Sequence, residues 1–520
     1  MGYPLMTRFY FTRPGNKGGF NVGGTNASGM IPDLASLVTG LIDVDTPQEA
    51  RISTKRGLND DEEWNLVFSD EFNTNGRSFY PGDDPFWEAH NLWAHGTVDY
   101  EWYDPAAITT KDGALVITAS EQALKNLNFR SGQLTSWNQF CFTGGYMEAA
   151  VVLPGDPHVS GWWPAIWTMG NLGRANYGAT TDGMWPYAYD TCDRGTLMNQ
   201  TDPDGSGPRS VFVTGAETGF NKIYHTSSLS WAPGQKLSSC TCDGEDHPGP
   251  KKAGGDYVGR SAPEIDLFEA QVDANTGGSL SLSGQWMPAS AGYRLKNGTG
   301  KEYDLFNIHG KDVTINSYRG NVYQMSASAI AHTDPDTYEL TGNKFAVFGI
   351  EYEPGPDGYI SWWIDGNRAW TIHAAAMAPD EEAGVGPRPI PEEPMYIIMN
   401  LAISRGFGYV NWDKLTFPAH LKVDYIRLYQ APGKENVGCD PKKFPTKDYI
   451  DRHILAYTNP NLTVWGGYQE VGGYGQVWPK NRLYGCNEEP RNYAGPLRGG
   501  GYDEAPASAS KNIPIESDNN

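Results

Sequence analysis

The chain has 520 residues, enough for one large all-β domain with extensions or for two to three average domains. Its 17 Trp, 29 Tyr, 62 Gly and 36 Pro favour a loop-rich β-protein over a helical bundle. The formal net charge of −22 argues against nucleic acid or an anionic membrane surface as a partner, because phosphate contacts need a basic face, and it is compatible with a neutral ligand.

The predicted elements begin with an irregular arm over residues 1–55, where Gly, Asn and Thr dominate and one helical turn is expected at 33–41. From Trp64 onwards, short apolar or alternating runs bounded by Gly, Pro, Asn or Asp predict the strands of a β-sandwich. The clearest predicted strands are 64–68, 114–119, 145–152, 345–352, 359–364 and, as the last of the domain, 422–430.

The main domain is therefore predicted over residues 56–430. Within it, the insertion at about 168–263 is expected to form a lid or a binding wall, because irregular spans of this length are usually functional. Residues 431–495 form an extension bracketed by Cys439 and Cys486, where a disulfide staple would support a weak local core, with a short helix near 447–457. Residues 496–520, rich in Gly, Ala and Ser, are predicted to be disordered.

The six cysteines have neither redox nor zinc spacing, so no metal site is predicted from them. Their even number and four N-x-S/T sequons favour the secretory-pathway lumen or the cell exterior. The start, MGYPLMT, has no signal-peptide core, and no run of about 18 apolar residues could span a membrane. We expect that a signal or anchor is missing from this chain, with a cytosolic location as the alternative. The sequons begin at Asn26, Asn199, Asn297 and Asn461.

Candidate chemistry lies in the segment 264–269, which reads EIDLFE. In a regular strand Glu264 and Asp266 share a face, whereas Glu269 lies an odd number of positions away and points to the other face. One extra residue in a β-bulge around Leu267 and Phe268 would bring all three carboxylates together. The alternative is an acidic strand that simply faces solvent.

Three carboxylates on one patch suit double-displacement glycoside hydrolysis, which needs two carboxyl groups about 5–5.5 Å apart. Glu264 is then the predicted nucleophile and Glu269 the predicted acid/base. Asp266, between them, would hydrogen-bond a neighbour and hold their protonation states apart by charge repulsion. No cofactor is predicted.

With its surroundings, this segment resembles the E-x-D-x-x-E signature of glycoside hydrolase family sixteen, the laminarinase-like enzymes. The resemblance implies an all-β, concanavalin-like β-jelly-roll sandwich and a β-glucan substrate. The further stretches that carry it follow in family order at 67–73 (VFSDEFN), 161–167 (GWWPAIW), 348–352 (FGIEY) with 363–366 (WIDG), 395–402 (MYIIMNLA) and 423–429 (VDYIRLY).

Within that family, the chain is most similar to the fungal branch associated with β-1,6-glucan synthesis and cell-wall assembly. Members of this branch have a cytosolic tail, one membrane anchor and a lumenal catalytic domain, so the resemblance implies membrane association through an anchor absent here. The supporting stretches are 79–85 (FYPGDDP), 101–106 (EWYDPA), 183–187 (GMWPY), 261–266 (SAPEID) and the sequence around Cys439.

The chain departs from the family's secreted β-1,3-glucanases at a Y-G-R-x-E-x-R strand, where Tyr146 and Ala150 stand in the arginine positions. The histidine expected on the strand after the catalytic one is not evident in 279–286. These changes leave the two proposed catalytic carboxylates in place and argue against efficient endo-hydrolysis of β-1,3-glucan.

Aromatic side chains are the predicted substrate-binding residues, because pyranose rings offer apolar C–H faces that stack on aromatic planes. Trp163 and Trp167 come first by motif position, and core packing is the alternative for each. Glu71 and Asp424 fall where some family members hold calcium, but ordinary turn carboxylates are favoured and no metal is predicted. The second set of candidates is Trp102, Trp137, Trp185 and, as a polar contact, Asn138.

Three functions stay open from the sequence. The favoured one is a retaining β-glucan glycosidase or transglycosylase in wall β-1,6-glucan biosynthesis and wall organisation. A non-catalytic glucan-binding or scaffold protein is the second, although such a protein has no need of two apposed carboxyl groups. A secreted endo-β-1,3-glucanase is the third, disfavoured by the missing signal peptide and by the C-terminal extension.

Overall fold

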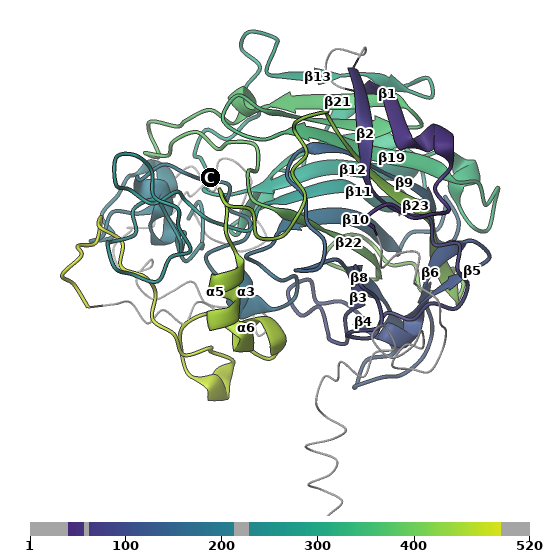
Figure 1. Ribbon diagram of the computed structural model, residues 1–520, viewed down its shortest axis with the longest axis horizontal. Helices are drawn as coiled ribbons and strands as arrows, with labels where there is room; N and C mark the ends of the chain where they lie inside the picture. The colour runs from purple at the N-terminus through teal and green to yellow at the C-terminus, as the bar shows by residue number, and fades with distance from the viewer. Residues whose placement is uncertain (1–39, 57–61, 213–227, 490–520) are drawn as a thin grey trace, which may run out of the picture.

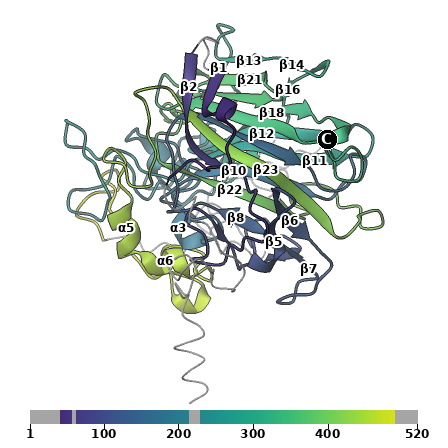
Figure 2. The ribbon, with the colours of Figure 1, turned by 45° about the vertical axis from the view of Figure 1, so that its right-hand side comes forward.

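The protein is described by a computed structural model over residues 40–56, 62–212 and 228–489. Two antiparallel β-sheets pack face to face and form the body of the molecule (Figures 1 and 2). The predicted all-β jelly-roll sandwich is confirmed. The predicted disordered tail, most of the N-terminal arm and its helical turn, and the sequon at Asn26 lie outside the described residues.

The first sheet has ten strands. Its order is β1-β2-β23-β9-β19-β20-β21-β13, and β6 pairs with β23 and with β5. The bounds are β1 (Ile52–Arg56), β2 (Glu62–Asp70), β5 (Ile108–Lys111), β6 (Ala114–Ala119), β9 (Gly145–Val152), β13 (Tyr303–Leu305), β19 (Ala346–Glu353), β20 (Tyr359–Ile364), β21 (Asn367–His373) and β23 (Ala419–Gln430).

The second sheet has nine strands, in the order β16-β18-β12-β11-β10-β22-β8-β3, with β17 beside β18. The segment 264–269 opens its strand β11. The bounds are β3 (Glu88–Ala89), β8 (Gln133–Thr135), β10 (Trp163–Gly170), β11 (Glu264–Asp273), β12 (Gly277–Trp286), β16 (Thr314–Ile315), β17 (Gly320–Asn321), β18 (Gln324–His332) and β22 (Met395–Ala402).

The remaining elements are short. Two small sheets pair β4 (Glu101–Tyr103) with β7 (Phe129–Ser131) and β14 (Asn307–Ile308) with β15 (Lys311–Asp312). The α-helices are α3 (Gly178–Thr181), α5 (Lys447–Arg452) and α6 (Ile454–Thr458). Single 3-10 turns lie at Gln48–Arg51, Pro105–Ala107, Arg194–Thr196, Met198–Gln200, Pro335–Thr337, Ala374–Met377 and Gln469–Val471.

The predicted strands are all present, and three of them, 114–119, 145–152 and 359–364, have the predicted bounds. The predicted helix near 447–457 is found as α5 and α6. These segments were predictable because each carries its own apolar pattern and is bounded by turn residues. Strands of two or three residues, such as β3 and β8, have too few positions to show a period.

Between the sheets lies one large apolar core. Strand β11 contributes Ile265, Leu267 and Phe268, all fully buried. Phe268 packs on Phe348 of the opposite sheet with ring centroids 4.7 Å apart. Trp362, also buried in this core, donates its indole N–H to the Asp266 carbonyl at 2.7 Å. Because these side chains face inward, the carboxylates of the same strand face outward.

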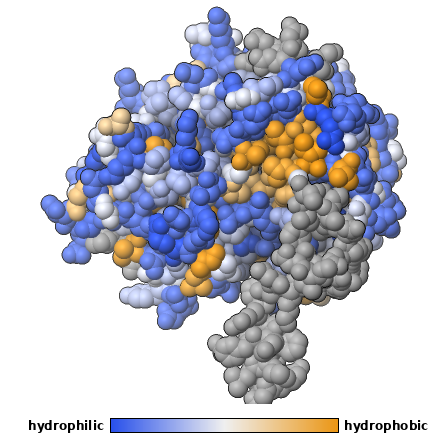
Figure 3. Space-filling view, viewed as in Figure 1, coloured by the Kyte–Doolittle hydropathy of each residue, from blue (hydrophilic) through white to orange (hydrophobic). Residues whose placement is uncertain are grey.

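Outside the sandwich, the described parts of the insertion (residues 171–212 and 228–263) and the extension (residues 431–489) gather at one side, while residues 168–170 of the predicted insertion belong to strand β10. Helices α3, α5 and α6 lie together beside the ends of the sheet strands in both ribbon views (Figures 1 and 2). The face of the molecule seen in Figure 3 is mainly hydrophilic, with one larger hydrophobic area in its upper right part. That surface agrees with the high net charge of the chain.

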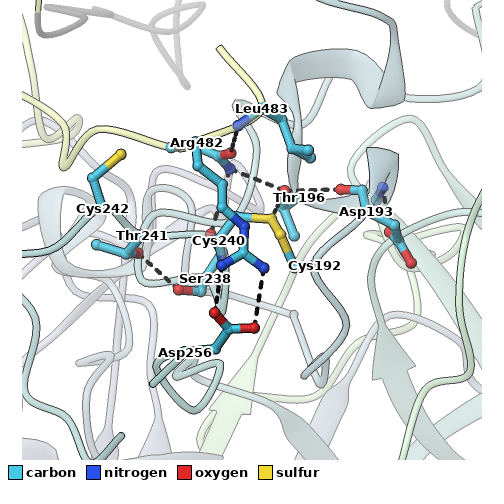
Figure 4. Close-up of a disulfide and its surroundings, with 12 residues drawn as sticks. Cys192, Asp193, Thr196, Ser238, Cys240, Thr241, Cys242, Asp256, Arg482 and Leu483 are labelled. Atoms are coloured by element: carbon cyan, nitrogen blue, oxygen red, sulfur yellow. Dashed lines mark hydrogen bonds and ion pairs between the residues drawn. A yellow bond between two sulfur atoms is a disulfide. The ribbon is translucent and has the colours of Figure 1, made fainter. Parts of the chain in front are cut away.

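Three disulfides join distant parts of the chain: Cys141–Cys439, Cys192–Cys240 and Cys242–Cys486. The disulfide expected within the extension, between Cys439 and Cys486, is therefore not formed. Each of these cysteines binds the extension to another part of the molecule, the first to the segment before β9 and the second to the insertion. Figure 4 shows the Cys192–Cys240 bridge beside the extension, whose Arg482 N–H donates to the Cys240 carbonyl at 3.0 Å.

Candidate active site

A β-bulge on β11 sets the direction of its carboxylates. Against β12, Asp266 is opposite Ser283 and Glu269 is opposite Ser281, so two residues of β11 face one residue of the partner strand. The extra residue restores the phase of the strand, as the spacing of the carboxylates predicted. Glu264, Asp266 and Glu269 thus share the outer face of the nine-stranded sheet, which we call the carboxylate face.

Asp266 is held by the neighbouring strand β12. The Ser283 hydroxyl donates to Asp266 Oδ2 at 2.7 Å, and the Gln285 amide donates to the same oxygen at 3.1 Å. Ser283 also lies 3.4 Å from Glu269 Oε2. Asp266 is buried, so these hydrogen bonds replace the water that the carboxylate has lost.

Two tryptophans bind the outer carboxylates. Trp163, on β10, donates its indole N–H to Glu269 Oε1 at 3.0 Å. Trp185, from the insertion, donates its indole N–H to Glu264 Oε2. Each of these side chains therefore orients one carboxylate instead of only offering an apolar face.

Burial raises the pKa values of all three carboxyl groups, and the charge of Asp266 raises those of Glu264 and Glu269 further. Burial raises the pKa of Glu269 to about 8, and the charge of Asp266 adds to the effect. Burial raises the pKa of Asp266 to about 6, opposed by hydrogen bonds from Ser283 and Gln285. The pKa of Glu264 is also raised, by burial and then by Asp266, while the Trp185 hydrogen bond lowers it. Such a group titrates as one unit and retains protons near neutral pH.

Trp167 lies next to this group, because its register partner on β11 is Asp266. Its indole N–H donates to Asn400 Oδ1 of β22 at 2.8 Å. Asn400 in turn lies 3.5 Å from the Tyr103 hydroxyl. Trp163 and Trp167 are half-buried, and both lie on the carboxylate face, since Trp163 donates to Glu269 and Trp167 is the register partner of Asp266.

The other predicted binding residues, Trp102, Trp137 and Asn138, make hydrogen bonds to other parts of the protein. Trp137 stacks on Tyr457 of the extension and donates to the Asn171 carbonyl at 3.1 Å. Asn138 exchanges hydrogen bonds with the same Asn171. Trp102, on β4, donates to Asn91 at 2.8 Å. The contacts found for these three side chains are thus to other parts of the protein and not to the carboxylates.

Four contributing residues were not singled out from the sequence: Ser283, Gln285, Asn400 and Phe407. Ser283 and Gln285 sit on alternate positions of the strand after the carboxylates, and small polar residues there were the available signal. Phe407 stacks on Trp163 with centroids 4.2 Å apart. No local pattern marks Asn400 or Phe407, since both reach the site through pairings far apart in sequence.

The insertion and the extension together form a wall beside Glu264, at one end of the carboxylate face. Met169 and Tyr396 of the sheet share one apolar cluster with Met184 of the insertion and with Tyr457 and Trp465 of the extension. Trp137, Trp167 and Trp185 pack against it. Arg260, fully buried just before β11, pairs with Glu393 at 2.8 Å and donates to the Pro445 carbonyl of the extension. These contacts fix the position of the wall relative to the strand.

The replaced arginine positions lie elsewhere. Tyr146 and Ala150 belong to β9 of the ten-stranded sheet, where Tyr146 donates to Glu148 at 2.8 Å. Neither residue therefore belongs to the nine-stranded sheet, whose outer face is the carboxylate face. Glu71 forms a two-point ion pair with Arg427, at 2.9 and 2.7 Å. Among the described residues, no cluster of three His, Cys, Asp or Glu side chains could hold a metal ion.

The three disulfides are typical of proteins that fold in an oxidising compartment. No helix within residues 40–56, 62–212 and 228–489 is long and apolar enough to cross a membrane. The sequons at Asn297 and Asn461 are exposed, whereas Asn199 is partly buried.

Fold and site together define a class, a two-sheet jelly-roll sandwich with a carboxylate cluster on one outer face. The sequence model of the beta-glucan synthesis-associated protein SKN1/KRE6/Sbg1 family matches residues 1–486. The chain therefore belongs to this family, and the predicted resemblance to the fungal β-glucan synthesis branch is confirmed.

Individual relatives agree with this assignment. The chain is 42% identical over 461 residues to beta-glucan synthesis-associated protein KRE6 of Saccharomyces cerevisiae, covering 88% of this chain and 58% of that protein. It is 41% identical over 460 residues to SKN1 of Candida albicans, covering 88% and 56%. The chain thus spans a little more than half the length of these relatives.

More distant similarity reaches bacterial proteins. The endo-1,3-1,4-beta-glycanase ExsH of Rhizobium meliloti is 26% identical over 192 residues, which is 32% of this chain and 38% of that protein. Among solved structures, the catalytic domain of an endo-1,3-beta-glucanase from Thermotoga petrophila is 17% identical, with a TM-score of 0.39. It covers 72% of this chain and all of that one.

Proposed function

We propose that this chain is a retaining β-glucan glycosidase or transglycosylase that acts in the synthesis of cell-wall β-1,6-glucan and in wall organisation. The observation that carries the proposal is the bulge on β11, since it turns Glu264 and Glu269 to one face with Asp266 between them. The names of the relatives support β-glucan as the substrate class and synthesis as the setting. Residues 56–430 are the proposed catalytic domain.

In the first step, Glu264 attacks the anomeric carbon and forms an ester bond to the sugar. The bond from that carbon to the leaving oxygen breaks, and Glu269 gives its proton to this oxygen. A raised pKa suits Glu269 for this role, because an acid must hold its proton until the bond breaks. The indole N–H of Trp185 favours the ionised form of Glu264 that the attack requires.

In the second step, Glu269, now ionised, accepts a proton from water or from a sugar hydroxyl. The oxygen of that group attacks the anomeric carbon and releases Glu264. Water gives hydrolysis, and a glucan hydroxyl gives transfer to a longer chain. The same pair of carboxylates serves both outcomes, so the acceptor decides which reaction is observed.

The test compares the unchanged chain with Glu264→Gln and Glu269→Gln on β-1,3- and β-1,6-linked gluco-oligosaccharides, with products followed by chain length. We expect turnover to be lost in the first variant and to fall by about 10²–10⁴-fold in the second. Longer products indicate transfer and shorter ones hydrolysis.

The matched control is Asp273→Asn, which removes a carboxylate from the exposed end of the same strand. It should leave the product profile unchanged. If Glu264→Gln gives the same products at the same rate as the unchanged chain, the proposed chemistry is wrong and a glucan-binding scaffold becomes the better explanation. The presence of Tyr146 and Ala150 in the family's arginine positions does not favour that alternative, because both residues lie in the other sheet.

A further inference from the structure

The loop after β22, residues 403–418, lies on the Glu269 side of the carboxylate face. Trp163, which donates to Glu269, stacks on Phe407 of this loop with an angle of 2° between the ring planes. The next residue, Gly408, faces Gln271, two positions beyond Glu269 on the same strand. The loop is therefore linked through Trp163 to the carboxylate to which we assign the acid/base role.

Several backbone and side-chain contacts hold this loop in place. The Ile403 N–H donates to the buried Glu101 carboxyl at 3.1 Å, and the Ser404 hydroxyl donates to the Thr97 carbonyl at 2.6 Å. Farther along, the Asn411 N–H donates to the Ser160 carbonyl at 3.0 Å. A loop anchored along its length can present side chains in fixed positions.

The loop presents aromatic rings to solvent. Tyr409 is 77% exposed and Trp412 is 43% exposed. Phe129 stacks behind Trp412 with centroids 5.1 Å apart and 13° between the planes, and Tyr100 meets the ring edge at 5.1 Å. Phe129 in turn stacks on Phe417 at 5.1 Å. One face of the Trp412 ring is thus covered by protein, and the column of rings behind it fixes its orientation.

An exposed aromatic ring gives up the stabilisation that burial of a large apolar side chain provides. A single exposed ring is common and needs no explanation. Here, however, two exposed rings lie on the same anchored loop: Tyr409 is two positions and Trp412 five positions beyond Phe407, which stacks on the Glu269 donor Trp163. Neutral sugar rings, with apolar C–H faces and hydroxyl edges, match tyrosine and tryptophan surfaces of this kind.

We propose that residues 403–418 form an acceptor platform, on which a β-glucan chain with its reacting hydroxyl at Glu269 continues over Tyr409 and Trp412. This inference rests on the proposed function. In double displacement, Glu269 serves first the leaving oxygen and then the incoming hydroxyl, and both belong to the chain on the acceptor side. A surface continuous with Glu269 is therefore where that chain lies, and it favours transfer over hydrolysis by holding the acceptor.

Binding is tested in the full chain carrying Glu264→Gln, which allows binding without turnover, with long linear β-1,3- and β-1,6-gluco-oligosaccharides as probes. Adding Trp412→Ala or Tyr409→Ala should weaken binding by about tenfold. Trp412→Phe should restore much of the loss, since it keeps an aromatic face. Tyr468→Ala is the matched control, because Tyr468 is 75% exposed but lies in the extension.

A second measurement uses the otherwise unchanged chain. Trp412→Ala should lower the ratio of transfer to hydrolysis, whereas Tyr468→Ala should leave that ratio as it is in the unchanged chain. If Trp412→Ala and Tyr409→Ala bind and transfer like Tyr468→Ala, the platform is wrong, and loss of turnover in Glu264→Gln would still support the proposed function. If Glu264→Gln changes no product but Trp412→Ala weakens binding, the chemistry is wrong and the glucan-binding surface stands.

Discussion

At the scale of single residues, the carboxylate face is notable for the neutral donors around it. Glu264, Asp266 and Glu269 accept hydrogen bonds from tryptophan, serine and glutamine side chains, as described above. Neutral donors satisfy buried oxygens without adding a positive charge. An arginine in their place would hold the carboxyl groups ionised. The neutral shell therefore allows the raised pKa values that proton transfer needs.

The first prediction concerns the alkaline limb of the pH–rate profile. This limb reports loss of the Glu269 proton, with a pKa of about 8. Because the negative charge of Asp266 raises this pKa, Asp266→Asn should shift the limb to lower pH. Because the Ser283 hydroxyl lowers it, Ser283→Ala should shift the limb to higher pH. Turnover of a gluco-oligosaccharide from about pH 5 to pH 10 gives both shifts.

The opposite signs make this prediction specific. A general structural defect would lower the rate at every pH without moving the limb. Shifts of both variants in the same direction would contradict the assignment of the limb to Glu269. Ser281→Ala serves as a control, because Ser281 is the register partner of Glu269 on β12 and has no hydrogen bond to it among those described.

At the scale of elements, the bulge on β11 has a consequence for the core. Leu267 and Phe268 are adjacent in sequence, yet both are fully buried between the sheets. In a regular strand two neighbours point to opposite faces, so only one of them could be inside. The carbonyl of Asp266 at the bulge accepts from Trp362, which compensates for the interrupted ladder.

The second prediction follows from this double burial. Leu267→Ala and Phe268→Ala should each lower the free energy of unfolding by about 2–5 kcal/mol, because each leaves a cavity in the core. Urea unfolding followed by tryptophan fluorescence measures the loss. Val272→Ala, at a half-buried position near the end of the strand, should cost less. A small effect at either Leu267 or Phe268 would indicate a regular strand without the bulge.

At the scale of the whole molecule, the insertion and the extension form one wall on the sandwich. Two disulfides attach the extension, one through Cys141 and one through Cys242. The buried pair Arg260–Glu393 lies between the wall and the sheet. Trp185, the donor to Glu264, belongs to the insertion and packs against the apolar cluster of the wall. The geometry of Glu264 therefore depends on segments outside the two sheets.

The third prediction concerns these bridges. Cys242→Ser with Cys486→Ser opens a bridge that spans 244 residues, whereas Cys192→Ser with Cys240→Ser opens one that spans 48. Because a longer loop loses more entropy when it is closed, the first pair should lower the melting temperature more, with a loss of about 2–5 kcal/mol. Thermal unfolding without reductant measures both. A larger effect from the second pair would contradict the entropic account.

Much of this protein was determined by the sequence alone, because the decisive signals were local. Alternating apolar runs predicted the main strands, and the spacing of Glu264, Asp266 and Glu269 predicted the bulge that joins them on one face. The ordered motifs predicted the family. Trp163 and Trp167 lie on the carboxylate face, since both belong to a strand beside β11, and their role in substrate binding stays a prediction.

Only the tertiary structure decided the contacts made across long sequence separations. Trp185 lies 79 positions from the carboxylate that it binds, and Cys141 lies 298 positions from its partner. No periodic pattern predicts such pairs, because they depend on how the insertion, the extension and the sheet pack together. For the same reason the sequence ranked Trp102 and Trp137 with Trp185, although only Trp185 of the three has a hydrogen bond to a carboxylate of the cluster among those described; substrate binding by Trp102 and Trp137 stays a prediction. The local sequence determines which side chains a strand turns to each face, and the tertiary packing determines which of these side chains meet.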